Sequence, residues 1–243
     1  MTRCIVAAGP SLRESDRALF PDIRFVDPLA EGDVLRLLKA RPRAIGILDG
    51  VFRDQLPVGH KEILWAMSEG VAVYGAASIG ALRAAELHRY GMVAVGEIAE
   101  GYISGRLNRD SDVALVHGPA SLGYVPLTVP MVEVSATLNA LAYADRLIEA
   151  DVAALSFAAH ELHYSVRTWE AIVSQARPSM TGQTEKLSET LSGSHVELKR
   201  LDGLALLHRL QSDFAKETLV VPDCPAPPIT PPFSDALKRA GIA

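Results

Sequence analysis

The sequence has few cysteines, no excess of basic residues and no long uncharged apolar run. Its two cysteines, Cys4 and Cys224, lie near opposite ends of the 243 residues, which excludes a disulfide framework and a cysteine-rich zinc site. The 24 Lys and Arg residues are outnumbered by 29 Asp and Glu residues, and the formal net charge is −5. Such a balance disfavours a protein that binds nucleic acid through its phosphates.

Membrane and secretion signals are also lacking. A membrane span requires roughly 18 uncharged apolar residues, whereas the uncharged stretch 117–132 is interrupted by three prolines. The apolar run at the N-terminus extends over only about five residues, too few for a signal peptide. We therefore expect a cytoplasmic protein that binds neither a membrane nor nucleic acid. The chain does contain 49% hydrophobic residues, enough for a substantial core.

The first half of the chain alternates short β-branched runs with helical patterns. The expected strands are 3–8, 24–26, 44–48 and 71–74, and the expected helices include 31–40, 57–69 and 78–90. Strands that alternate with helices predict parallel pairing through right-handed crossovers. The predicted fold class is therefore α/β, with a doubly wound, mostly parallel sheet.

The second half has a different character. From about residue 133 the apolar residues follow helical spacing, and six prolines lie among the eleven residues 222–232. We expect three parts: an α/β core with the active site over 1–130, an all-helical portion over 131–220, and a Pro-rich tail with a short terminal helix over 221–243.

One expected strand end has the character of a catalytic turn. The strand 71–74 runs into a helix through Ala76-Ala77-Ser78-Ile79-Gly80. A serine between small residues at a strand-to-helix turn is typical of a nucleophile elbow, and a helix N-terminus suits an oxyanion. The alternative role of Ser78 is to cap the helix, which does not exclude catalysis.

A nucleophilic serine needs a base, and two candidates stand at the start of the preceding expected helix. His60 could take the proton of Ser78, or Lys61 could do so if burial lowers its pKa. A histidine in a helix is, however, more often a surface residue or a satisfied core residue. The carboxylates available to orient the imidazole are Asp49, Asp54 and Glu62.

Other polar residues receive structural interpretations. Arg83 and Glu86 are three residues apart on the expected helix 78–90, a spacing that predicts an ion pair. Glu86 also shares a helix face with Ser78. The only metal-like grouping, at 110–117, fits no metal-binding motif. We therefore expect neither a metal nor another cofactor.

Several segments together resemble the core of TfuA-like proteins. They are GPS (9–11), LDGVF (48–52), PVGHKEIL (57–64) and GAASIGALRAAEL (75–87). The resemblance extends over about residues 5–118 and implies a role beside a YcaO enzyme, which installs thioamides in ribosomally synthesised peptides. It further implies sulfur delivery by hydrolysis of the C-terminal thiocarboxylate of a ubiquitin-like sulfur carrier. A YcaO enzyme and this carrier are thus the expected partners.

The resemblance and the residue pattern combine into one hypothesis. Ser78 attacks the thiocarboxyl carbon, and sulfide leaves. His60 or Lys61 is the base, Asp49 or Glu62 orients it, and Arg83 holds the anionic end of the carrier. The donors expected to surround the tetrahedral anion are the N–H groups of Ile79 and of the turns containing Gly9 and Ser11 or Asp49 and Gly50.

Three alternatives stay open at this point. Water activated near Ser78 could be the nucleophile, with Ser78 only donating a hydrogen bond. The protein could instead be a scaffold or allosteric activator that docks the carrier and the YcaO enzyme. A nucleotide site at the turn 9–11 is disfavoured because a phosphate loop's spaced glycines and lysine are absent. The oligomeric state is open, a homo-oligomer included.

Overall fold

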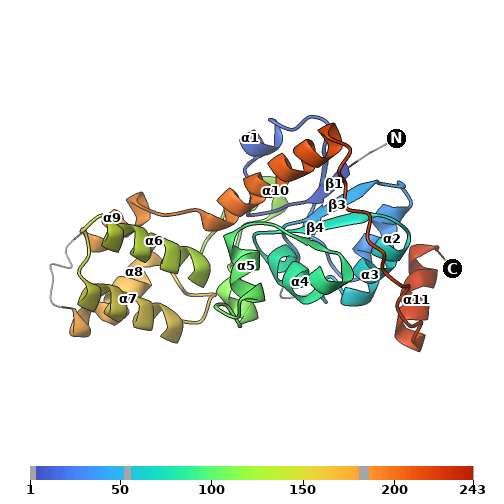
Figure 1. The fold of residues 1–243 in the computed structure, drawn as a ribbon. Coiled ribbons are helices and arrows are strands. Elements are labelled where there is room, and N and C mark those ends of the chain that lie inside the picture. Colours follow the sequence, from blue (N-terminus) through green and yellow to red (C-terminus); the bar gives the residue numbers. More distant parts are fainter. Residues whose placement is uncertain (1–3, 52–55, 181–185, 243) are drawn as a thin grey trace. The chain divides into compact units, whose positions relative to one another are not determined.

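The computed structural model describes residues 4–51, 56–180 and 186–242. The chain forms two compact units (Figure 1): one contains Met1–Asn108 and Lys199–Ala243, the other Arg109–Leu198. These limits differ from the expected divisions at 130 and 220. The difference arises because the last long helix returns to the sheet and packs in its core, although its apolar spacing resembles that of the helices before it.

The first unit is built on a five-stranded, all-parallel sheet, which confirms the predicted α/β class. Its strands are β1 (Cys4–Ala7), β2 (Arg24–Val26), β3 (Ala44–Ile47), β4 (Ala72–Gly75) and β5 (Val93–Ala94). They are ordered β2-β1-β3-β4-β5. Strand β5 was not predicted, because two residues are too few to show a strand pattern.

Helices cover both faces of the sheet. One face packs against α2 (Asp33–Leu38), α3 (His60–Ser68) and α4 (Ile79–Leu87). The other packs against α10 (Leu198–Ala215) and against Leu12 and Phe20, which flank α1 (Glu14–Arg17). The helix α5 (Glu97–Ile103) packs against α4. Strands covered on both faces have no polar side to alternate with, which is why they appear in the sequence as continuous apolar runs.

Helix α3 begins three residues later than expected. Its N-cap is Gly59, whose N–H donates to Glu62 Oε1 at 2.6 Å, an interaction that starts the helix at His60. Pro57 pairs instead with Ala30 in an isolated bridge. The predicted start of this helix at 57 is therefore wrong, whereas its end near 69 is confirmed.

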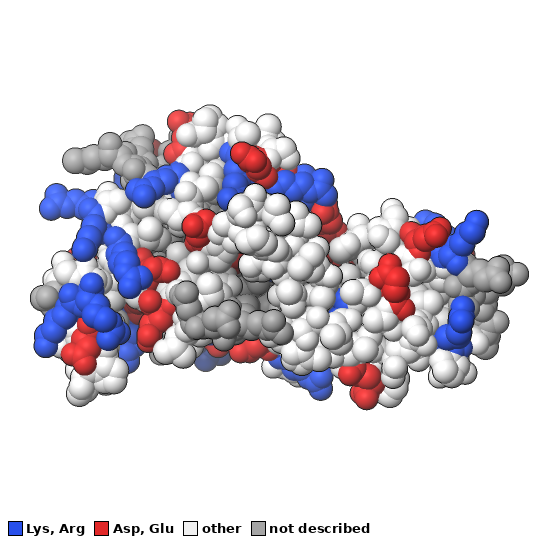
Figure 2. All heavy atoms as spheres, turned by 180° about the vertical axis from the view of Figure 1, so that it is seen from behind, with Lys and Arg blue, Asp and Glu red and all other residues white. Residues whose placement is uncertain are grey.

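The C-terminal tail packs on the first unit. Its helix α11 (Pro231–Ala240) buries Phe233 against Trp65 of α3 and contacts Leu35 of α2. Figure 2 shows Lys and Arg gathered over the end of the molecule that carries α2 and α11. The exposed cations of these two segments include Arg36, Lys39, Lys238 and Arg239.

The second unit is helical. It contains η2 (Asp110–Asp112), η3 (Ala120–Leu122), α6 (Met131–Tyr143), α7 (Glu149–Glu161), α8 (Trp169–Ala176), η4 (Arg177–Ser179) and α9 (Leu187–Gly193), while the short η1 (His88–Tyr90) follows α4 in the first unit. Its core includes the fully buried side chains of Leu138, Leu155 and Ile172. No helix in the described part of the chain is long and apolar enough to cross a membrane.

Candidate functional site

The order of the strands in the sheet indicates where a ligand is expected to bind. In an open parallel sheet, ligands bind beyond the carboxyl ends of the strands, at the point where the order reverses, and in this order that point lies between β1 and β3. The turn Gly9–Ser11 follows β1, Asp49 follows β3, and Ser78 follows β4 at the same edge. The predicted turns are thus gathered at one edge of the sheet.

Ser78 lies in a tight turn between β4 and α4. Ser78 is 4% exposed and occupies the N-cap position of α4, but its side chain makes no capping hydrogen bond, so the alternative role as a side-chain cap is wrong. Ala77, just before it, has φ +66°, an uncommon conformation for a residue with a side chain. Gly80 packs so closely on β3 that a Cβ there would lie 1.8 Å from the Ile47 carbonyl oxygen. The hydroxyl of Ser78 is therefore held at the strand end without a capping role.

Two backbone donors lie beside Ser78 without an acceptor in the described chain. The N–H groups of Ser78 and Gly80 both donate to the Leu48 carbonyl, at 3.3 and 3.2 Å. Among residues 4–51, 56–180 and 186–242, no acceptor takes the N–H of Ile79 or Gly50. These two residues are adjacent, since a Cβ on Gly50 would lie 2.8 Å from Ile79 Cγ2. Two residues whose N–H groups were expected to hold an oxyanion are thus close to each other.

Asp49 accepts the hydrogen bonds of the turn Gly9–Ser11, which follows β1. One carboxylate oxygen, Oδ2, accepts from Gly9 N at 2.8 Å and Ser11 N at 3.0 Å, and Oδ1 accepts from the Ser11 hydroxyl at 2.7 Å. Asp49 is 2% exposed. Its carboxylate therefore fixes the turn after β1, and its hydrogen bonds go to that turn and not to His60.

A buried lysine that the sequence analysis missed lies beside Asp49. Lys199 Nζ is 3.9 Å from Asp49 Oδ1, and both side chains are 3% exposed. Lys199 and Arg200 stand in the first turn of α10, where the helix dipole disfavours positive charge. That unfavourable placement is the signal in the sequence that could have drawn attention to this residue.

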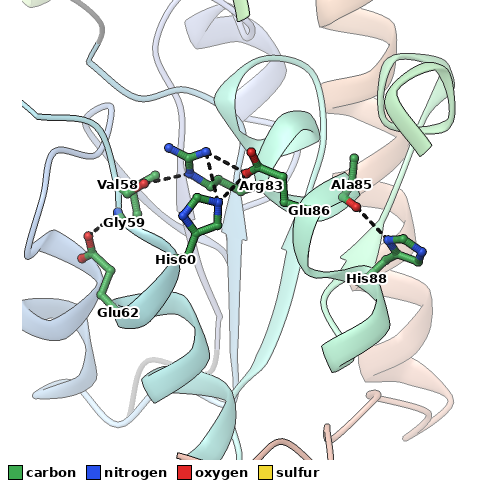
Figure 3. Close-up of polar contacts among 8 residues, drawn as sticks. All are labelled: Val58, Gly59, His60, Glu62, Arg83, Ala85, Glu86 and His88. Atoms are coloured by element: carbon green, nitrogen blue, oxygen red, sulfur yellow. Dashed lines mark hydrogen bonds and ion pairs between the residues drawn. The ribbon is translucent and has the colours of Figure 1, made fainter. Parts of the chain in front are cut away.

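His60, Arg83 and Glu86 form a separate cluster (Figure 3). Glu86 Oε2 lies 2.7 Å from His60 Nε2 and accepts from Arg83 Nη1 at 2.7 Å, which confirms the predicted Arg83–Glu86 ion pair. Arg83 Nε donates to the Val58 carbonyl at 2.9 Å. Burial raises the pKa of Glu86, but the hydrogen bonds from His60 and Arg83 outweigh burial and leave the pKa below its ordinary value.

This cluster stands apart from Ser78. In the described chain, no hydrogen bond joins His60 or Lys61 to the Ser78 hydroxyl. Glu86 follows Ser78 by eight residues, about 12 Å along a helix axis. Among the described residues, the structure thus pairs His60 with Glu86 and shows no hydrogen bond from either expected base to the serine.

Glu62 and Lys61 have structural partners. The Glu62 carboxylate accepts N–H groups of Gly59, Gly32 and Val34, so it joins the starts of α2 and α3. Burial raises its pKa to about 7, against the opposing effect of these three donors. Lys61 Nζ donates to Pro228 O at 3.0 Å and Thr230 Oγ1 at 2.9 Å. The remaining expected carboxylate, Asp54, lies outside the described residues.

The two buried cysteines are not suited to act as nucleophiles. Cys4 is buried in β1, and burial raises the pKa of its thiol to about 12, so it is not a thiolate at neutral pH. Cys224 is also buried, and its pKa is raised by burial. Of the residues that the structure describes, no three of the His, Cys, Asp and Glu type are grouped as metal ligands.

Comparison with known protein families identifies this part of the chain. The family model described as TfuA-like protein matches residues 49–168, from just after β3 to the N-cap of α8, with Asp49, His60, Ser78 and Arg83 inside the match. No curated protein sequence matches the chain. The matched segment carries the Ser78 turn together with the adjacent donors of Gly50 and Ile79. Residues 49–168 of the chain therefore form a TfuA-like domain.

Proposed function

We propose that this protein supplies sulfide to a YcaO enzyme by hydrolysing the C-terminal thiocarboxylate of a ubiquitin-like sulfur carrier. The match to the TfuA-like family suggests a role in YcaO-associated thioamide biosynthesis. The hydrolysis, the carrier and direct work with the YcaO enzyme on ribosomally synthesised peptides are our proposal. The observation that carries it is the strand-to-helix turn of Ser78, whose side chain makes no capping hydrogen bond and whose neighbour Ile79, like the nearby Gly50, has an N–H that no acceptor in the described chain takes.

The chemistry proceeds in two balanced steps. The Ser78 oxygen attacks the thiocarboxyl carbon, the C–S bond breaks, and the hydroxyl proton leaves with the sulfur as hydrosulfide. Water then cleaves the acyl-serine ester, which gives the carrier carboxylate and a proton and restores the hydroxyl. The N–H groups of Ile79 and Gly50 stabilise the tetrahedral oxyanion in both steps.

This proposal depends less on a general base, His60 or Lys61, than the sequence suggested. The imidazole of His60 is hydrogen-bonded to Glu86, and the ammonium of Lys61 is bonded to the tail. Because the proton of Ser78 can depart on the leaving sulfur, the first step needs no histidine. We expect His60→Ala to retain most of the sulfide release and Ser78→Ala to lose it.

The test is sulfide release from a purified carrier. The full chain is mixed with a thiocarboxylated ubiquitin-like protein, free sulfide is followed, and the carrier mass is checked for conversion to the carboxylate. Removal of a serine nucleophile lowers turnover by several orders of magnitude in enzymes of this kind. Sulfide release at the same rate from Ser78→Ala would contradict the proposal.

A scaffold is the second candidate, and the helical unit favours it. Several large apolar side chains there are exposed, among them Tyr143 at 94% and Phe157 at 68%, and exposed apolar side chains are common at partner surfaces. A scaffold or allosteric activator predicts that Ser78→Ala still supports thioamide formation by the YcaO enzyme. Tyr143→Ser and Phe157→Ser would then abolish it.

A further inference from the structure

We propose that the cavity between the starts of α2, α3 and α11 binds a primary ammonium group carried on a short aliphatic chain. Ser78 is not among the residues that line this cavity, so the inference is independent of the proposed hydrolysis. Two features support it: a buried carboxylate without a cationic partner, and apolar side chains beside it.

The cavity is large enough for a small organic ligand. Its volume is about 360 Å³, within the range of ligand pockets, about 300–1,000 Å³. It is lined by the start of α2, the first turn of α3 and the first two turns of α11, which lie together in the first unit (Figure 1). The lining residues Glu31, His60 and Thr230 are exposed, so a ligand can enter from solvent.

Glu62 supplies the buried carboxylate of this cavity. It is 3% exposed and accepts three backbone N–H groups. Within residues 4–51, 56–180 and 186–242, however, no ion pair includes Glu62. A buried carboxylate without a charged partner is costly, and burial raises the pKa of Glu62 to about 7. A cation that enters the cavity would supply the missing partner.

The other charged groups that line the cavity also favour a cation. Glu31 adds a second carboxylate, and no ion pair in the described part of the chain includes it. The Lys61 ammonium donates to two oxygens of the tail, at 3.0 and 2.9 Å. The His60 ring is turned toward Glu86 and bonded to it (Figure 3). The two basic side chains are thus directed to partners of their own, whereas neither carboxylate has a cation.

An anionic ligand is disfavoured, although three helices begin at this cavity. A helix N-terminus favours an anion, but the Glu62 carboxylate already takes that place by accepting N–H groups at the starts of α2 and α3. Asp33, in the first turn of α2, adds further negative charge and also raises the pKa of Glu62. A second anion would therefore be repelled by the carboxylates already present.

The apolar lining suits an aliphatic chain. Leu35 of α2 and both Phe233 and Ala236 of α11 line the cavity and belong to one apolar cluster. Pro232 adds further apolar surface. A lysine side chain buries its methylene groups along such surface while its ammonium stays with polar partners. We therefore expect a ligand with a chain of about four or five carbons, the length of a lysine side chain.

The experiment titrates the full chain with n-pentylamine at pH 8 and follows tryptophan fluorescence. An amine of this kind, with a pKa near that of lysine, about 10.4, is charged at this pH. Trp65 packs on Phe233 with ring centroids 5.9 Å apart, so its emission reports on the cavity. Trp169 lies in the core of the second unit and adds a constant background. We expect saturable binding, at least tenfold tighter than that of the uncharged 1-pentanol.

Two variants test whether the amine binds at this cavity. Glu62→Gln removes the negative charge and should weaken binding of n-pentylamine at least tenfold, with binding of 1-pentanol unchanged. Glu69→Gln, at the exposed C-terminal end of the same helix, is the matched control and should bind as the wild type does. If Glu62→Gln does not fold, Ala236→Leu takes its place, because it fills the apolar lining and should weaken binding of both probes.

A further titration distinguishes a free amine from the lysine side chain of a peptide. The probe is a glycine-lysine-glycine tripeptide, acetylated at its N-terminus and amidated at its C-terminus, so that its only ammonium is that of the lysine. Binding as tight as that of n-pentylamine would assign the site to a lysine of a protein partner. Binding of the free amine alone would assign it to a small amine.

Either of two results would overturn the inference. One is a wild type that binds n-pentylamine no more tightly than 1-pentanol, or binds neither. The other is a folded Glu62→Gln variant, or a folded Ala236→Leu variant in its place, that binds n-pentylamine as tightly as the wild type.

Discussion

Replacement of Gly80 by alanine tests whether close packing of α4 on β3 holds the Ser78 turn in place. The new methyl group would lie 1.8 Å from the Ile47 carbonyl oxygen and 2.5 Å from its carbon, where real Cβ atoms stay at least 3.0 Å away. Both neighbours are backbone atoms of the central strand and cannot rotate aside. The first turn of α4 therefore has to move away from β3 by about 1 Å or more.

The loss of unfolding free energy that this displacement causes can be bounded. Overpacking a well-packed core costs about 1–3 kcal/mol, and a clash with backbone places Gly80→Ala near about 3 kcal/mol. The shift also lengthens the hydrogen bonds from Ser78 N and Gly80 N to the Leu48 carbonyl. Gly193→Ala is the matched control: it changes a helical glycine with nothing within 4 Å of the added methyl group, which should stabilise its helix by about 0.5–1 kcal/mol.

The assay is urea unfolding followed by circular dichroism, together with sulfide release per folded molecule. We expect Gly80→Ala to be destabilised and to lose at least tenfold in release, and Gly193→Ala to keep wild-type release. A Gly80→Ala protein as stable and as active as the wild type would refute the claim that this contact positions the site.

Three further predictions concern groups around the site. The pKa of Glu62 rises from 4.5 to about 7 on folding, so its contribution to stability is present below pH 4.5 and is lost as the pH rises through 7. By urea unfolding, the wild type should therefore lose about 3 kcal/mol relative to Glu62→Gln between pH 4.5 and 8, and a pH-independent difference would contradict this. Lys61→Met removes both hydrogen bonds to the tail, so limited proteolysis after residue 220 should accelerate severalfold, with Lys216→Met as the unaffected control. Asp202→Ala leaves two N–H groups at the start of α5 without an acceptor and should lower the free energy of unfolding by about 1–3 kcal/mol; an unchanged urea midpoint would exclude this capping role.

The parts of the fold that were predictable are those with a local cause. The parallel strands are covered on both faces, so β1, β3 and β4 appear as short apolar runs. The Ser78 turn was recognisable because small residues on both sides of a serine are needed where α4 meets the sheet. The Arg83–Glu86 ion pair follows directly from helical spacing.

The parts that were not predictable depend on residues distant in the sequence. Glu62 bonds N–H groups 28 and 30 residues away, so its structural role resembles that of a catalytic carboxylate until the contacts are known. Lys199 and Asp49 are 150 residues apart, and nothing local joins them. Lys61 reaches the tail across 167 residues. Periodicity placed α10 with the helical portion because apolar spacing does not say which core a helix joins.

The most direct test of the account is to trap the acyl intermediate on Ser78. The full chain is mixed with the thiocarboxylated carrier at low temperature, quenched in acid within one turnover, and analysed by intact and peptide mass spectrometry. The account predicts an adduct on the peptide containing Ser78, with the mass of the carrier less one molecule of hydrogen sulfide, and its loss in Ser78→Ala. Conversion of the carrier to its carboxylate under slow turnover, with no adduct on this peptide at any time, would contradict nucleophilic attack by Ser78.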